Sequence, residues 1–532
     1  MPLPPPPSPG SPPGAAPQQP APRPRTRSTG LAVAAALLAL ALAVVSIGAV
    51  AVISAQRSQI AALTDEVATL EDELERAQAE AEDPAPGEDP APDDSPGLLD
   101  GLGEGLGELL EGLFGDDGPG LGDLLPDEGL AACLQPSADL DALPSGGPAE
   151  QLPEIAERVE ELRELEFPDP VETQFAAGPD FEADLRARVE ADLDRTELEH
   201  EQRRLVALGA IPADTDLAAL QLDLVSGQAA GFYDTVEQEI VVRVDAPDAP
   251  LRPVEQVALA HELEHALSDA VLGLPLGADA RGDADADRAA LALVEGGATV
   301  LMQHYAVAVL DLRDQLMLGF DPSIAESQAQ LDAYPHHLRR GLLFPYEEGL
   351  AFTCRLLRDG GWAAVDEAYG ELPVTSAQIL WPQRYLDGEE AVAVPEPADP
   401  PGDWEEAGSD TLGAAELSWL FEAPGGQRDA ALSDPLARAA AWAGGAIHTW
   451  TRADDTAVAI RLAERDEAPS RLCDSVHDWY VAAFPDGDDA GTQAGEALAW
   501  DTAEQAAVLA CDDDGVALGI GPDVDSARAL SR

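Results

Sequence analysis

The sequence contains no lysine: all 30 of its basic residues are arginines, against 101 acidic residues, and the formal net charge is -71. This excess of negative charge excludes nucleic acid, and an anionic membrane face, as partners of the main body of the chain. Two explanations of the bias remain open. An acidic surface stays soluble at high ionic strength, where salt screens its self-repulsion, and a GC-rich genome favours the same Arg, Ala and Asp residues.

Cysteine is also scarce. The chain has Cys133, Cys354, Cys473 and Cys511, and no two of them stand in a Cys-x-x-Cys pair. This spacing excludes a zinc finger built on cysteines. If the body of the chain lies outside the cytoplasm, one or two disulfides are allowed, and we expect Cys473 to pair with Cys511.

One long stretch, residues 30–55, is apolar and lacks charge altogether, and the Pro-rich residues 1–29 before it end in Arg23, Arg25 and Arg27. The stretch is long enough to form a transmembrane helix. It lacks a good cleavage site, which favours an uncleaved signal anchor. Arginines on its N-terminal side predict a cytoplasmic tail over 1–29. We therefore expect a single-pass protein of the cell membrane, with the rest of the chain extracytoplasmic.

Residues 56–148 offer little to build a core. Between 56 and 82, apolar residues recur three and four positions apart, which predicts a helical stalk or a short coiled coil. These residues are Ile60, Leu63, Val67, Leu70, Leu74 and Ala77. The flanking charges are nearly all acidic and repel across a homodimer, so a weak homodimer and a single solvated helix both remain open. Residues 83–148 are rich in Asp, Glu, Gly and Pro, which predicts a disordered acidic spacer.

The body of the chain carries a His-Glu-x-x-His motif, His261-Glu262-x-x-His265, in an apolar helical pattern that begins near Pro253. Residues four apart lie on one face of a helix, about 6 Å apart, so His261 and His265 can bind one tetrahedral metal ion. Glu262 would reach a metal-bound water and act as its general base. The alternative is a pair of surface histidines on an ordinary helix.

A catalytic zinc ion, Zn²⁺, needs a third protein ligand and leaves one position for water. We expect this ligand to be Glu295, the only carboxylate in a predicted helix over 288–305, because an ionised Glu among apolar residues needs a cation. Gly296 and Gly297 lower helix propensity, and a close approach to the metal helix would account for them. The alternative is a solvated Glu295 on an amphipathic helix.

Three aspartates just upstream, Asp283, Asp285 and Asp287, are rival third ligands. Their turn-like spacing favours capping over coordination. We expect Asp287 to be the N-cap of the second helix and the other two to be solvated. A calcium loop is excluded because the remaining ligand positions and the closing Glu are missing.

Two short strands are predicted around a turn, over residues 231–234 and 239–244, directly upstream of the metal helix. In zinc peptidases a strand near this helix aligns the substrate backbone as an added strand, and this pair is the candidate for that role. A hydrolase also needs a donor for the developing oxyanion. Tyr346 is our candidate, with the adjacent His336 and His337 as rivals.

The alternative for Tyr346 is an aromatic core residue that caps a helix over 347–357. His304 and Tyr305, near the end of the second helix, are expected to be packing residues.

Helical patterns dominate from residue 151 to residue 208. Late in the chain, residues 446–451 and 457–462 flank a turn as a hairpin.

These residues carry a family resemblance. His261-Glu262-x-x-His265 with the later Glu295-Gly296-x-Ala298 resembles the gluzincin branch of zinc metallopeptidases, in which aminopeptidase N-like enzymes show the same Glu-Gly-x-Ala run around the third ligand. Residues 150–480 more broadly resemble a family of uncharacterised bacterial membrane-anchored or secreted proteins with zincin-like domains. The segments that carry this wider likeness are residues 230–234, 293–296, 344–349 and 360–362. The resemblance implies a peptidase fold and leaves the substrate open.

The expected fold class is α+β. Residues 149–392 would form a mainly helical zincin-like catalytic domain with a small sheet, residues 393–410 a linker, and residues 411–532 a small C-terminal α+β domain. The expected function is a zinc metallopeptidase that hydrolyses a peptide or protein substrate. The alternative is a catalytically silent zincin-like scaffold that binds a protein or a component of the cell envelope.

Overall fold

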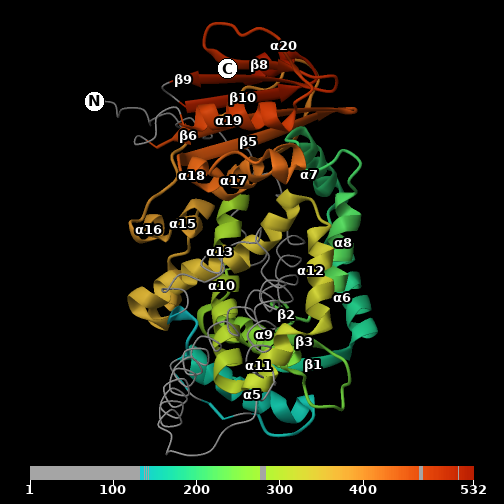
Figure 1. Cartoon of the computed structure of the whole chain (residues 1–532), viewed down its shortest axis with the longest axis vertical. Coiled ribbons are helices and arrows are strands. Elements are labelled where there is room, and N and C mark those ends of the chain that lie inside the picture. The colour runs from blue at the N-terminus through green and yellow to red at the C-terminus, as the bar shows by residue number, and fades with distance from the viewer. Residues whose placement is uncertain are drawn as a thin grey trace, which may run out of the picture.

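The computed structural model describes residues 132–136, 138, 140–141, 143–275, 283–465, 471–512 and 515–532. Over these ranges the fold is mixed α+β, as expected, with one small and one large sheet (Figure 1). None of the helices in these ranges is long and apolar enough to cross a membrane. The predicted tail, transmembrane helix and stalk, and most of the predicted spacer, lie outside the described residues.

The small sheet has the order β1-β3-β2, with β1 at Glu172–Ala177, β2 at Gly231–Asp234 and β3 at Glu239–Val244. Strand β3 pairs in parallel with β1 and antiparallel with β2. The predicted strands are thus β2 and β3, and β1 interrupts a region that was predicted to be helical. Successive side chains of β3 point to opposite faces: Ile240 and Val242 join the main core, whereas Val241 packs with Phe181 and Phe232.

Long helices build the core around this sheet. The principal ones are α5 (Pro148–Arg163), α9 (Pro253–Leu272), α10 (Ala284–Val309) and α13 (His336–Gly360). Helix α10 is buried along nearly its whole length, because it is apolar on all sides, as a central helix must be. The surrounding helices are α6 (Gly178–Asp192), α7 (Arg195–Ala207), α8 (Leu217–Gln228), α11 (Leu312–Gly319), α12 (Pro322–Asp332), α14 (Trp362–Gly370), α15 (Ser376–Leu380) and α16 (Pro382–Leu386).

The large sheet has the order β4-β5-β6-β10-β9-β8-β7 and is antiparallel throughout. Its strands are β4 (Glu405–Asp410), β5 (Trp442–Arg452), β6 (Asp455–Glu464), β7 (Asp488–Asp489), β8 (Glu496–Asp501), β9 (Ala506–Asp512) and β10 (Gly515–Gly521). The predicted hairpin lies within β5 and β6. Part of the predicted linker 393–410 is instead the edge strand β4, which pairs with β5.

Four helices accompany this sheet: α17 (Ala414–Glu422), α18 (Pro435–Ala439), α19 (Arg471–Ala483) and α20 (Val524–Leu530). A second core lies between the sheet and its helices, and it also includes Leu198 and Leu205 of α7. Helix α17 lies between the two halves of the molecule (Figure 1). It contributes Trp419 to the core around α9 and Leu417 to the second core.

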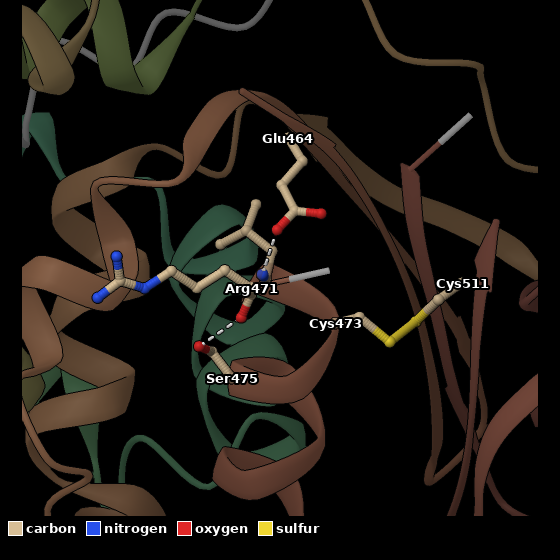
Figure 2. Close-up of a disulfide and its surroundings, with 6 residues drawn as sticks. Glu464, Arg471, Cys473, Ser475 and Cys511 are labelled. Atoms are coloured by element: carbon tan, nitrogen blue, oxygen red, sulfur yellow. Dashed lines mark hydrogen bonds between the residues drawn. A yellow bond between two sulfur atoms is a disulfide. The ribbon is translucent and has the colours of Figure 1, made fainter. Parts of the chain in front are cut away.

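All four cysteines are paired. Figure 2 shows the predicted Cys473–Cys511 disulfide, which joins α19 to β9. The same view shows Glu464, at the end of β6, accepting the Leu472 N–H at the first turn of α19 (2.6 Å), which satisfies one of the unpaired donors of a helix start. The second disulfide joins Cys133 to Cys354 of α13.

Candidate metal centre

Helix α9 carries the His-Glu-x-x-His motif, and its ends are set by the sequence. Pro253 stands in the first turn, where its missing N–H costs nothing. Glu255 accepts the N–H of Arg252 (2.7 Å) and so satisfies a donor at the helix start. Gly273 ends the helix with a φ of +80°, a conformation that favours glycine. Between these ends the helix is buried from Val254 to Ser268, which fixes the motif inside the core.

Three side chains converge at the centre of this core. His261 Nε2 lies 3.0 Å from His265 Nε2 and 3.2 Å from an oxygen of Glu295, and His265 Nε2 lies 3.4 Å from the same oxygen. In a tetrahedral site with metal–ligand bonds of about 2.0–2.1 Å, neighbouring ligand atoms lie roughly 3.3 Å apart. The three separations therefore fit a single metal ion between these atoms.

The burial of the triad supports the same interpretation. Glu295 is fully buried, and His261 and His265 are 1% and 5% exposed. A carboxylate removed from water needs a cation or strong hydrogen bonds. Over the described ranges, these residues are the one set of three His, Cys, Asp or Glu side chains whose ligand atoms converge closely enough to hold a metal ion. His261, His265 and Glu295 thus form a group that could bind a metal.

Glu262 lies beside the triad, against strand β2. Its carboxylate faces the backbone of Tyr233 in this strand. A Cβ on Gly231 would stand only 3.1 Å from Glu262 Cγ, so a larger residue at this point of β2 would crowd the side chain. Burial raises the pKa of Glu262 to about 8, and the nearby Glu295 carboxylate adds to the rise. A buried carboxyl group with a raised pKa can both accept and return a proton near neutral pH.

Tyr346 also lies at the site. Its ring stacks on His261, with ring centroids 6.4 Å apart and ring planes at 26°, and its side chain is buried. The expected helix start at residue 347 is wrong, because α13 begins at His336 and runs through Pro345 and Tyr346. Tyr346 therefore does not cap a helix, and both its ring packing and its position beside His261 are fixed by α13.

The other aromatic and histidine candidates have partners elsewhere. His336 is hydrogen-bonded to Glu422 of α17 (2.8 Å), and His337 lies 3.6 Å from Glu416 of the same helix. His304 bonds the backbone oxygen of Cys133 (2.7 Å) and packs edge-on against the Trp362 ring. Tyr305 is fully buried in the core. The predicted packing role of His304 and Tyr305 is confirmed.

The three aspartates before α10 differ from expectation. The N-cap is Asp283, not Asp287, because α10 begins earlier than predicted and the Asp283 side chain accepts the N–H groups of Asp285 and Ala286. Asp285 is not solvated. It is fully buried, and its carboxylate accepts the N–H of Ser376 (2.9 Å). The described group that could hold a metal ion contains none of the three.

The glycines after Glu295 are explained by a different helix–helix contact from the one expected. A Cβ on Gly296 would stand 2.2 Å from the backbone oxygen of Gly349, so Gly296 allows α10 to cross α13, not α9. A Cβ on Gly297 would meet Glu264 of α9 at 3.7 Å, which is ordinary van der Waals contact. The prediction of a close approach to the metal helix is therefore wrong for Gly296 and unnecessary for Gly297.

Sequence analysis missed two buried charges near the triad, Arg163 of α5 and Glu264 of α9, which form an ion pair (3.2 Å). The signal for Glu264 was present, because it is a second carboxylate within the apolar stretch around the motif. No signal in the sequence pairs it with Arg163.

No family model matches the sequence, and neither a curated protein nor a solved structure was found to match it.

Proposed function

We propose that this protein is a zinc-dependent peptidase of gluzincin type. The observation that carries the proposal is the convergence of His261, His265 and Glu295 on one point, with Glu262 of the same helix packed against Gly231 of the edge strand β2. Two imidazole nitrogens and one carboxylate oxygen are a donor set typical of catalytic zinc. These three residues would hold the ion.

A bound zinc ion supplies Lewis acidity and lowers the pKa of a coordinated water towards neutrality. Glu262 accepts the proton of the attacking water and then delivers it to the leaving amine nitrogen. Its side chain is buried against Gly231 of β2, which restricts the positions that the carboxylate can take. Tyr346, stacked on His261, is proposed to donate a hydrogen bond from its hydroxyl to the developing oxyanion.

The substrate backbone is proposed to bind along β2. In the described sheet β2 is an edge strand, with β3 on its other side. An edge strand presents unpaired N–H and C=O groups, to which an extended peptide adds as a further strand. Gly231 and Tyr233 bring this edge against Glu262. A peptide bound there would pass the general base.

We also propose that residues 30–55 anchor the protein in the cell membrane, with the peptidase on the extracytoplasmic side. The two disulfides support this location, because disulfides persist in oxidising compartments and are rare in the cytosol.

Peptide hydrolysis by the full-length protein tests the proposal. We expect Glu262→Gln to lower kcat/KM by at least about 100-fold, the usual contribution of a general base, while zinc content stays at one ion per chain. Glu255→Gln is the matched control, since Glu255 is also buried on α9 but lies at the helix start, where it accepts two backbone N–H groups and pairs with the Arg252 side chain. Equal hydrolysis by the wild type and Glu262→Gln would refute the proposed mechanism, and a wild type without bound zinc would refute the metal site.

A scaffold that binds a partner without turnover is the second candidate. Burial favours it, because Glu262 and His261 are each 1% exposed and a peptide must reach both. One zinc ion per chain with no hydrolysis of any peptide by the wild type would support the scaffold. Zinc that is retained by the wild type and lost in Glu295→Ala would still establish the ligand set.

A further inference from the structure

Glu264 is a buried carboxylate one residue before the metal-binding His265. It is fully buried, on the same helix as the motif. One oxygen, Oε1, accepts two hydrogen bonds, from Arg163 Nε (3.2 Å) and from Ser268 Oγ (2.7 Å). These two donors fix the orientation of the carboxylate group and leave its other oxygen, Oε2, for a different partner.

Arg163 is itself held in place from the side of α14. Its Nη2 donates to Asp366 (2.6 Å), and its guanidinium stacks on the Trp362 ring at 4.4 Å from the centroid. The arginine side chain is fully buried, whereas Asp366 is partly exposed. Arg163 thus links α5, α14 and α9, and its charge compensates the buried carboxylate of Glu264.

The second oxygen of Glu264, Oε2, lies near the ring nitrogen of His265 that does not face the metal position. Glu264 Oε2 lies 3.8 Å from His265 Nδ1. Within the described part of the chain, neither atom has a hydrogen-bond partner. The other ring nitrogen of His265, Nε2, is the atom that meets His261 and Glu295. One buried histidine therefore presents Nε2 to the metal position and Nδ1 to a buried acceptor.

We infer that Glu264, held by Arg163, is the positioning residue of His265: it accepts a hydrogen bond from the Nδ1–H and so directs the Nε2 lone pair at the metal. The inference rests on the proposed metal site. A neutral imidazole must carry its proton on the nitrogen that does not bind metal, and an acceptor behind the ring selects that tautomer and fixes the ring plane. The two atoms need to approach by about 0.8 Å to reach hydrogen-bond length. His261 Nδ1 also has no hydrogen-bond partner among the described residues, but only His265 has the Glu264 carboxylate near its Nδ1, so the inference concerns His265.

Zinc affinity tests this role separately from activity. The dissociation constant of the full-length protein is measured by competition with a chromogenic zinc chelator. We expect Glu264→Gln to weaken zinc binding by about 10- to 100-fold, the usual effect of removing such a partner, because an amide is a poorer acceptor than a carboxylate. Glu255→Gln, on the same helix but away from the triad, is expected to change stability without changing zinc affinity. Zinc binding by Glu264→Gln within twofold of the wild type would overturn the inference.

A second variant covers the case in which Glu264→Gln does not fold because Arg163 loses a carboxylate. The double change Arg163→Met with Glu264→Met removes both charges together, and Asp366 is exposed enough to be solvated. The inference predicts a similar loss of zinc affinity in this variant, and wild-type affinity would overturn it. If the wild type itself binds no zinc, the proposed metal site fails and the inference fails with it. If the wild type binds zinc and both variants bind it with the same affinity, the metal site stands and the role of Glu264 is refuted.

Discussion

At the scale of single residues, Asp285 shows what burial does to an acidic side chain in this highly acidic protein. It is fully buried near the start of α10, where its carboxylate accepts the Ser376 N–H and lies 3.6 Å from Arg288. Burial raises the pKa of Asp285 to about 6 from an ordinary 3.8, and Arg288 opposes the rise only in part. The folded state therefore holds this proton more tightly than the unfolded chain does.

This difference predicts a specific pH dependence. Between about pH 4 and pH 6 the folded protein binds more protons at Asp285 than the unfolded chain, so the wild type loses stability at this site as the pH rises. Asp285→Asn does not titrate, and we expect it to gain stability relative to the wild type over the same range, by at most about 3 kcal/mol. Urea unfolding of both proteins at several pH values measures the difference. A difference that stays constant across the range would contradict this expectation.

The residues of the site differ in how far the sequence could predict them. His261, Glu262 and His265 follow from local spacing, since four residues make about one helical turn. Glu295 follows from its apolar surroundings, although it lies 34 residues away from His261. Arg163 could not be found, because it lies 101 residues before Glu264 and any arginine of the chain could have met that carboxylate.

At the scale of elements, α10 and α13 cross with their backbones in close contact near the site. Gly296 and Gly349 face each other there: a Cβ on Gly349 would stand 2.2 Å from the backbone oxygen of Ala292, and one on Gly296 equally close to that of Gly349. Side chains at these two positions would push the helices apart. Because α10 carries Glu295 and α13 carries Tyr346, the crossing also sets the distance between these two site residues.

The two neighbouring glycines of α10 give a matched test of this crossing. We expect Gly296→Ala to destabilise the protein by about 1–3 kcal/mol or more, because the methyl group overlaps backbone of α13. Gly297→Ala adds the same group where contacts are ordinary, and we expect it to stabilise the helix by about 0.5–1 kcal/mol. Thermal or urea unfolding of both variants decides. Equal stability of the two would show that the crossing is not as tight as described.

The elements that were predicted correctly have strong local patterns, and those that were missed do not. Strand β3 alternates its apolar side chains between two buried faces, and a tight turn links it to β2. Strand β1 has no fully buried residue, and only its parallel pairing with β3 makes it a strand. The start of α13 was misplaced because Pro345 favours a first turn, whereas here it lies inside a long helix.

At the scale of the whole molecule, the domain boundary expected at residues 393–410 does not separate the two cores. Helices from either side of it pack into the other core. Helix α7 comes from the first half of the described chain but packs its Leu198 and Leu205 into the second core. Helix α17 serves both cores. The apolar stripe of a helix is the same whichever core it faces, so its spacing reveals that a helix is half-buried and not which neighbour buries it.

The two disulfides close loops of very different length, which predicts different contributions to stability. Cys133 and Cys354 are 221 residues apart, and Cys473 and Cys511 are 38 residues apart. In the chain-entropy model the longer loop contributes about 1.5 kcal/mol more. We therefore expect the Cys133→Ala, Cys354→Ala double variant to lose more stability than the Cys473→Ala, Cys511→Ala variant. Urea unfolding without reductant compares them, and an equal or smaller loss would contradict the loop-length account.

The Cys133–Cys354 bond also determines how the molecule bears a mechanical load. Force applied through the residues before Cys133 does not pass first into α5, the first long helix of the described chain, which could otherwise peel away from the core. It enters α13 through the covalent bond, and α13 is braced against α10 where Gly349 meets Gly296. If residues 30–55 are fixed in a membrane, tension on that tether is carried by the pair of helices that supports Glu295 and Tyr346.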